Sequence, residues 1–275
     1  MTHKALLEQI KVKKSFLCVG LDIDKKRIPE QLKGKPDAIF IFCKKIIEAT
    51  APYCVAFKPN LAFFEAYGLE GWKSLEKVMS FLNQGYPEIF TIADAKRADI
   101  GNTSMRYAKA YFEQFEFDSV TIAPYMGKDS VEPFLKYEGK HAILLALTSN
   151  KGALDFQMLH SEGKLLYEKV IEKSRKWENA DRLMYVVGAT KAQALKEIRN
   201  LIPDSFLLIP GVGAQGGSLE EVAVNGLNDE CGLLVNSSRG ITYASTNDDF
   251  DQVAASIAKD FQTQMAFHLS KKGIV

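Results

Sequence analysis

Eight short apolar runs follow one another along this chain, and each is followed by polar or glycine-rich residues and then by a segment of helical periodicity. Continuous apolar runs of this kind are typical of parallel strands that are covered on both faces. Eight such repeats in about 230 residues predict an α/β fold that closes into a (β/α)8 TIM barrel. The predicted strands are Phe16–Leu21, Cys54–Phe57, Ile89–Ala93, Val120–Ala123, Ala142–Leu147, Met184–Val187, Phe206–Ile209 and Leu233–Val235.

An open, doubly wound sheet is the main alternative architecture. It should show a Gly-x-Gly-x-x-Gly turn after its first strand, whereas residues 20–24 read Gly-Leu-Asp-Ile-Asp. We find no linker or low-complexity stretch, so residues 1–275 are expected to form one barrel domain. The longest connection, 150–183, has room for a loop and an extra helix over the mouth of the barrel.

Two of the intervening segments carry apolar residues at helical spacing, which predicts one buried face on each helix. The first face consists of Ile39, Phe42, Cys43, Ile46 and Ile47, and the second of Met105, Ala108, Phe112 and Phe115.

The composition is that of a soluble globular protein, with 47% hydrophobic and 25% charged residues. The net charge of +1 provides no overall field that would favour nucleic acid or a membrane surface. The four cysteines are far apart and lie in apolar settings, which predicts buried free thiols in a reducing compartment. Without a signal peptide or an apolar run of about 18 residues, we expect a cytoplasmic protein.

The third apolar run leads directly into Asp94, Lys96 and Asp99. Strand side chains alternate between faces, so Asp94 and Lys96 should point the same way, about 6.5 Å apart along the strand. Burying carboxylates and an ammonium group together is costly unless they pair with one another. A charged cluster at the end of a strand therefore indicates chemistry, and a buried structural ion network is the alternative.

Other unusual residues also follow predicted strands, at the end of the barrel where active sites lie. They are Asp22, Lys58-Pro59-Asn60, Thr148-Ser149-Asn150, the segment Pro210 to Gly217, and the segment Asn236 to Gly240.

The segments after the seventh and eighth strands resemble a phosphate site. Glycine-rich backbone can bring N–H groups close to an anion, and Arg239 can add a bidentate contact. The alternatives are that the glycines only form tight turns and that Arg239 and Lys58 are surface residues, with Asp22 capping a helix. The four histidines fall outside these motifs and are expected at the surface or in incidental places. No metal-ligand spacing is present, so no metal or cofactor is required.

The pattern Asp94-x-Lys96-x-x-Asp99 resembles the signature of the orotidine 5′-phosphate decarboxylase family. The family's other elements follow in order as Asp22, Lys58, Gln215 and Arg239, so the resemblance extends over roughly residues 16 to 240. The local sequences around Lys58 and Thr148 are similar to those of the longer-chain bacterial members of the family.

The resemblance implies cofactor-independent conversion of orotidine 5′-monophosphate to UMP and CO2, the last step of de novo pyrimidine nucleotide synthesis. It also implies a homodimer in which Asp99, with Ile100 and Thr103 beside it, reaches the active site of the neighbouring subunit.

The same resemblance implies a role for each matched residue. Lys96 would protonate C6, Asp94 would lie near the substrate carboxylate, and Lys58 and Asp99 would keep both charged and oriented. The substrate would be held by the remaining residues: the ribose by Asp22, Asn60 and the partner's Thr103, the pyrimidine by Thr148 or Ser149, and the phosphate by Gln215 and Arg239. Pro210 is a further expected substrate contact.

Three rival functions stay open at this point. A Schiff-base aldolase would use Lys58 or Lys96 as its nucleophile. A Mg²⁺-dependent sugar-phosphate decarboxylase could share the Asp-x-Lys-x-x-Asp motif. A non-catalytic barrel would bind UMP and turn nothing over.

Overall fold

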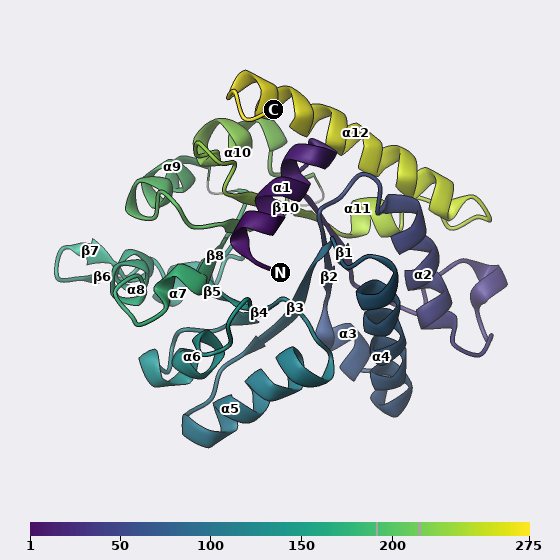
Figure 1. Ribbon diagram of the computed structural model, residues 1–275, viewed down its shortest axis with the longest axis horizontal. Helices are drawn as coiled ribbons and strands as arrows, with labels where there is room; N and C mark the ends of the chain where they lie inside the picture. Colours follow the sequence, from purple (N-terminus) through teal and green to yellow (C-terminus); the bar gives the residue numbers. More distant parts are fainter. Residues whose placement is uncertain (191, 214–215) are drawn as a thin grey trace.

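Eight parallel strands form a closed barrel surrounded by helices in the computed structural model, which describes residues 1–190, 192–213 and 216–275 (Figure 1). The order around the barrel is β1-β10-β9-β8-β5-β4-β3-β2. This confirms the predicted barrel and its eight strands and excludes the open sheet. The strands are β1 Leu17–Leu21, β2 Ala56–Pro59, β3 Phe90–Arg97, β4 Ser119–Ile122, β5 His141–Leu147, β8 Leu183–Val187, β9 Leu207–Pro210 and β10 Leu233–Ser237.

Helices cover the outside of the barrel, which explains why the strands read as continuous apolar runs. Every residue of β1, β2, β4, β8 and β10 is buried, because one face packs into the barrel interior and the other against helices. The α-helices are α1 His3–Lys13, α2 Ala38–Thr50, α3 Leu61–Glu65, α4 Gly68–Gly85, α5 Gly101–Lys109, α6 Lys128–Leu135, α7 Ala153–Phe156, α8 Leu166–Ser174, α9 Ala192–Leu201, α10 Leu219–Gly226, α11 Arg239–Thr242 and α12 Phe250–Lys271.

The predicted apolar face of α2 is confirmed, because all five of its residues are buried. The predicted face of α5 is wrong at Met105, which is 44% exposed. The buried stripe begins one residue earlier, at Ser104, whose hydroxyl donates to the carbonyl of Ser130 at 2.7 Å. It continues through Ala108 into a π-helical turn, η2 (Ala110–Gln114), which buries Tyr111 and Phe112.

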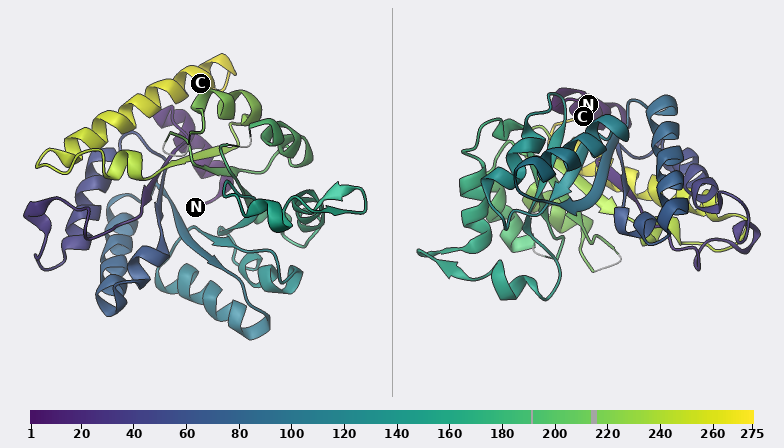
Figure 2. Two further views of the ribbon diagram at one scale, coloured as in Figure 1. Left: turned by 180° about the vertical axis from the view of Figure 1, so that it is seen from behind. Right: turned by 90° about the horizontal axis from the view of Figure 1, so that it is seen from below.

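The long connection between β5 and β8 contains more than one element. It holds α7, a two-stranded hairpin of β6 (His160–Ser161) and β7 (Lys164–Leu165), α8, and the 3-10 turn η3 (Ala180–Arg182). The hairpin projects from the rim of the barrel (Figures 1 and 2). The first short 3-10 turn of the chain, η1 (Glu30–Leu32), lies in the connection between β1 and α2.

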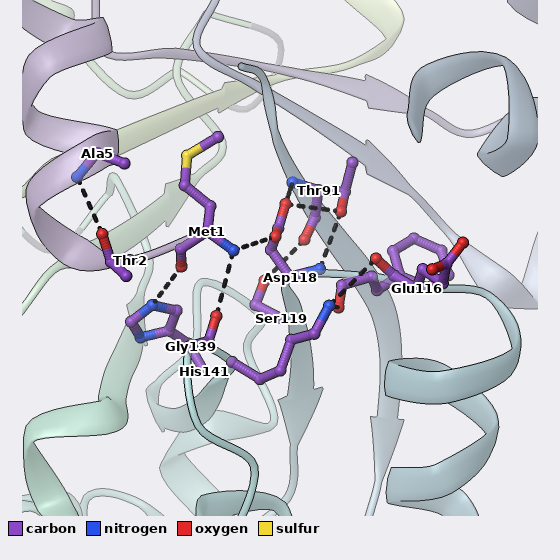
Figure 3. A network of polar contacts seen from close by, with 11 residues as sticks. Met1, Thr2, Ala5, Thr91, Glu116, Asp118, Ser119, Gly139 and His141 are labelled. Carbon is purple, nitrogen blue, oxygen red and sulfur yellow. Dashed lines mark hydrogen bonds and ion pairs between the residues drawn. The ribbon is translucent and has the colours of Figure 1, made fainter. Parts of the chain in front are cut away.

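A polar network lies where β3, β4 and β5 begin (Figure 3). The carboxylate of Asp118 accepts hydrogen bonds from the amide and the hydroxyl of Thr91 at 2.9 and 3.0 Å, and pairs with the amino group of Met1. The ring of His141 lies 3.1 Å from the carbonyl of Met1. His141 is buried, so of the two expected settings for the histidines, the surface or an incidental place, the surface does not apply to it.

The predicted state of the cysteines is confirmed, since Cys18, Cys43, Cys54 and Cys231 are all buried free thiols. Among the helices that the structure describes, none is both long enough and apolar enough to cross a membrane.

Candidate active site

Three charged side chains meet at the carboxyl ends of β2 and β3. The ammonium of Lys58 lies 2.8 Å from Asp94 Oδ2, and the ammonium of Lys96 lies 2.5 Å from Asp94 Oδ1. Lys58 is only 4% exposed, whereas the side chain of Lys96 is 52% exposed. One carboxylate therefore joins a buried cation to a cation that faces solvent.

The geometry at the end of β3 differs from the regular strand that the sequence predicts. Opposite β4, three residues from Asp94 to Lys96 face the single residue Thr121, and Lys96 has a left-handed φ of 48°. Thr121 stabilises this bulge by accepting from the Lys96 N–H at 2.9 Å and donating to Asp94 Oδ1 at 3.2 Å. Asp94 and Lys96 thus converge because of a bulge and not because of strand alternation.

The electrostatics of Asp94 and Lys58 favour their charged forms. Burial alone would raise the pKa of Asp94, but the ammonium groups of Lys58 and Lys96 outweigh it and hold that pKa well below its usual range. Burial alone would lower the pKa of Lys58, but Asp94 and then Asp22 raise it above its usual value. Asp94 is consequently ionised and Lys58 protonated at neutral pH.

These side chains line a cavity of about 440 Å³, a size typical of small-molecule sites. One side of the cavity is apolar, formed by Leu145, Val186 and Leu208, so the charges face a partly dehydrated space. The polar lining is Lys58, Asp94, Lys96, Thr121, Thr148, Ser149, Asn150 and Gln157, and Pro210 completes it.

Asp22, at the end of β1, has one satisfied and one unsatisfied oxygen. Ser238 donates to its Oδ2 at 2.6 Å, while its Oδ1 is buried and has no hydrogen-bond partner among the described residues. Tyr243 fixes the same loop, donating to the Asp22 carbonyl at 2.9 Å and accepting from the Asp24 N–H at 2.6 Å. A buried carboxylate oxygen without a partner suits a ligand hydroxyl.

The predicted phosphate residues lie after β9 and β10. Arg239 is exposed at the first position of α11, and no ion pair joins it to any residue in the described part of the chain. Gln215 lies outside the described residues. The N–H groups of Gly213, Gly216 and Gly217 donate to carbonyls within their own loop, so in this conformation those three donors are already used.

Asn60, Thr148 and Ser149 lie beside the charged groups. Asn60 follows β2 and forms a bridge with Asp94, while Thr148 and Ser149 follow β5 and line the cavity.

Asp99, in contrast, is not part of the charged cluster within this chain. Its carboxylate accepts from the Ile100 N–H at 2.7 Å, and across the described ranges no ion pair joins it to either lysine. Ile100 and Thr103 are exposed where α5 begins.

Three residues with a place at this site escaped the sequence analysis, namely Thr121, Gln157 and Tyr243. Each is a single polar residue whose importance depends on a partner distant in sequence, so local patterns carry no signal for it. In the parts of the chain that the structure describes, no group of three or more His, Cys, Asp or Glu residues is arranged to hold a metal ion.

Known proteins of one family match this chain over most of its length. The sequence profile described as "Orotidine 5′-phosphate decarboxylase / HUMPS family" matches residues 15–250. An orotidine 5′-phosphate decarboxylase of Christiangramia forsetii is 60% identical over 271 residues, which cover 98% of this chain and 100% of that protein. One of Flavobacterium johnsoniae is 60% identical over 272 residues, covering 99% of this chain and 100% of that protein.

Solved structures of similar sequence are also described as orotidine-monophosphate decarboxylases. The OMP decarboxylase of Leishmania donovani superposes with a TM-score of 0.82 at 36% identity, covering 97% of this chain and 100% of that one. A putative orotidine-monophosphate decarboxylase of Toxoplasma gondii gives a TM-score of 0.84 at 32% identity, covering 97% and 98%. The chain therefore belongs to the orotidine 5′-phosphate decarboxylase / HUMPS family and is an enzyme of the carboxy-lyase type.

Proposed function

We propose that this enzyme converts orotidine 5′-monophosphate to UMP and CO2 without a cofactor, as the last step of de novo UMP synthesis. The observation that carries the proposal is the Lys58–Asp94–Lys96 cluster at the edge of a cavity of nucleotide size. The relatives named above, which match over their full length, support the choice of substrate.

Loss of CO2 leaves an electron pair on C6 of the pyrimidine, and Lys96 is our candidate for stabilising and then protonating it. Its ammonium lies at the cavity and is held by Asp94, while its backbone is fixed by Thr121. A cation placed before the reaction stabilises developing negative charge with little reorganisation. The C6–carboxylate bond breaks, CO2 leaves, and the proton passes from Lys96 Nζ to C6.

Asp94 would lie near the substrate carboxylate, with Lys58 keeping it ionised from the buried side. Repulsion between the two carboxylates would be relieved as neutral CO2 departs. We infer that stabilisation of the carbanion by Lys96 contributes more than this repulsion, because the lysine interaction strengthens as the charge develops.

The remaining contacts would hold the nucleotide at a distance from the reacting carbon. The Oδ1 of Asp22, which has no partner among the described residues, suits a ribose hydroxyl. Asn60 lies close by, because its N–H donates to the carbonyl of Leu21, the residue before Asp22, at 3.3 Å. Arg239, exposed and without an ion pair to any described residue, suits the phosphate together with Gln215. Because the phosphate is remote from the reacting carbon, its binding energy can contribute to catalysis at C6.

A homodimer would complete the site. Asp99 does not contact either lysine of its own chain among the described contacts, which supports a role for it in the partner's site. Ile100 is 59% exposed and Thr103 is also exposed, as residues contributed to a neighbour should be in an isolated subunit. We place the enzyme in the cytoplasm and propose no nucleic-acid or membrane partner.

The charge state of Lys58 argues against an aldolase that uses Lys58 as its nucleophile. A Schiff base requires a neutral amine, whereas Asp94 and Asp22 raise the pKa of Lys58.

Ultraviolet absorbance of orotidine 5′-monophosphate with purified protein, with and without EDTA, tests the proposal. We expect the substrate band to disappear at the same rate in both samples. Loss of activity in EDTA would favour a Mg²⁺-dependent enzyme. A folded protein that leaves the band unchanged would refute the proposal and direct attention to sugar phosphates and borohydride trapping.

A further inference from the structure

Gln157 occupies a defined place beside the candidate active site. It follows α7 in the long connection between β5 and β8, and its side chain lines the same cavity as Lys96. Its backbone N–H donates to the carbonyl of Ala153 at 2.9 Å, and its carbonyl accepts from the N–H of Tyr167 at 3.1 Å. Both helices of this connection, α7 and α8, therefore fix the position of Gln157.

The amide of Gln157 binds two groups of Thr148. Its Oε1 accepts from the Thr148 N–H at 2.8 Å, and its Nε2 donates to Thr148 Oγ1, also at 2.8 Å. Thr148 Oγ1 in turn donates to Asn150 Oδ1 at 2.5 Å. An amide supplies the acceptor and the donor that this arrangement uses, whereas an ionised carboxylate would supply acceptors only.

The loop that Gln157 holds is also confined at Ser149. A Cβ on Gly188, which follows β8, would lie 2.8 Å from both Cβ and N of Ser149. The Thr148–Ser149 segment is thus in contact with the backbone of Gly188 as well as with the side chain of Gln157. The hydroxyl of Thr148 has acceptors within its own chain, Asn150 Oδ1 at 2.5 Å and Gln157 Oε1 at 3.2 Å, so Thr148 supports the segment in place of donating to a ligand.

We propose that Gln157 is a positioning residue that sets the specificity for the nucleotide base, by fixing the Thr148–Ser149 segment against the pyrimidine ring. The proposal rests on the proposed function, in which this segment faces the base and C6 faces Lys96. A displacement of about 1 Å at such a support can cost roughly a hundredfold in rate. Gln157 acts through Thr148 and does not touch the reacting atoms.

The test compares ligands with and without a base. Inhibition constants for UMP and for ribose 5-phosphate would be measured against orotidine 5′-monophosphate turnover in Gln157→Leu. The control is Gln264→Leu, which changes an exposed glutamine on α12. We expect binding of UMP to weaken about 10- to 100-fold and kcat/KM to fall by a similar factor, while ribose 5-phosphate stays within about twofold.

Gln157→Glu provides a second, milder variant. A carboxylate still accepts from the Thr148 N–H but cannot donate to Thr148 Oγ1, so UMP binding should weaken less than in Gln157→Leu. In addition, Thr148→Val combined with Gln157→Leu should cost less than the sum of the two single changes, because both act through one contact.

Three outcomes would overturn the inference. Equal weakening of UMP and ribose 5-phosphate would show general damage to the site. No change in either would show that the amide is irrelevant, and additive effects in the double variant would show that Thr148 does not mediate its action. Failure of the unaltered enzyme to bind UMP or consume orotidine 5′-monophosphate would instead refute the proposed function.

Discussion

Buried charges lie at both ends of this barrel, but they are satisfied in different ways. Where the strands begin, Asp118 accepts two hydrogen bonds from Thr91 and pairs with the amino group of Met1. Arg199 is only 8% exposed. Its guanidinium donates to five backbone carbonyls, those of Ile202, Pro203, Ser205, Gly226 and Gly232. Each of these charges is surrounded by partners from its own chain.

Where the strands end, the charges are only partly satisfied. Lys58 and Asp94 pair with one another, but the side chain of Lys96 stays half exposed and Asp22 Oδ1 has no partner among the described residues. Fully partnered buried charges hold a fold together, whereas incompletely partnered ones are available to a ligand. The same residue types therefore stabilise one end of the barrel and, in our proposal, react at the other.

Changing Asp94 should have the largest effect, since it lies both in the cluster that we propose to react and in a buried ion pair. Asp94→Asn should lower kcat at least roughly a thousandfold. It should also lower the free energy of unfolding by about 3 kcal/mol, because Lys58 loses its buried counter-charge. Steady-state kinetics and urea denaturation would measure both, with the exposed Asp260→Asn as control. Activity within tenfold of the unaltered enzyme would remove Asp94 from the chemistry.

Arg199 tests the opposite end of the barrel. Arg199→Ala leaves several carbonyls without their donor, and we expect the free energy of unfolding to fall by about 3 kcal/mol. The kcat of the protein that stays folded should hardly change. Lys196→Ala, an exposed cation on the same helix, is the matched control. A large loss of kcat without loss of stability would contradict the contrast between the two ends.

The network at the strand beginnings should also respond to pH. Burial lowers the pKa of His141 to about 4, below its ordinary value of 6.5, so the unfolded chain takes up a proton first as the pH falls. The burial of neutral His141 should therefore cost no stability above pH 6.5. The free energy of unfolding should decrease by about 3 kcal/mol as the pH falls from 6.5 to 4. Urea midpoints of His141→Gln and of the exposed His160→Gln would be followed over this range. If the urea midpoint depends on pH in the same way with and without His141→Gln, a group other than His141 causes the dependence.

The smallest of these effects is expected at Arg239, which is exposed and whose contact to the ligand would be screened. Arg239→Ala should raise KM about 10- to 100-fold and change kcat much less, because the phosphate lies far from C6. Arg175→Ala, also an exposed arginine, should leave both unchanged. An unaltered KM in Arg239→Ala would exclude this residue from the phosphate site.

The strands and the charged cluster were predictable because each leaves a local pattern. Continuous apolar runs mark strands that are buried on both faces, and the polar residues that interrupt them at Lys58, Asp94 and Lys96 mark the mouth of the barrel. The bulge was not predictable, because it depends on Thr121 across the neighbouring strand pair. The structural role of Arg199 was not predictable either, because its five carbonyl partners come from three separate segments of the chain.

Helix registers were predictable only where the helix is regular. The face of α2 follows from its spacing, but the face of α5 is shifted because a small polar residue, Ser104, lies at the buried position that Met105 was expected to fill. Gln157 illustrates a further limit, since a glutamine in a long connection has no distinguishing spacing. Only the folded chain brings it to Thr148.

The most direct test of the account is the activity of Lys96→Ala together with its affinity for UMP. The account predicts that turnover of orotidine 5′-monophosphate falls by at least roughly a thousandfold, because the proton donor and the cation at C6 are both lost. Binding of UMP should stay within about tenfold, because the ribose and phosphate contacts are unchanged. Substantial turnover by Lys96→Ala would contradict the central claim that Lys96 protonates C6.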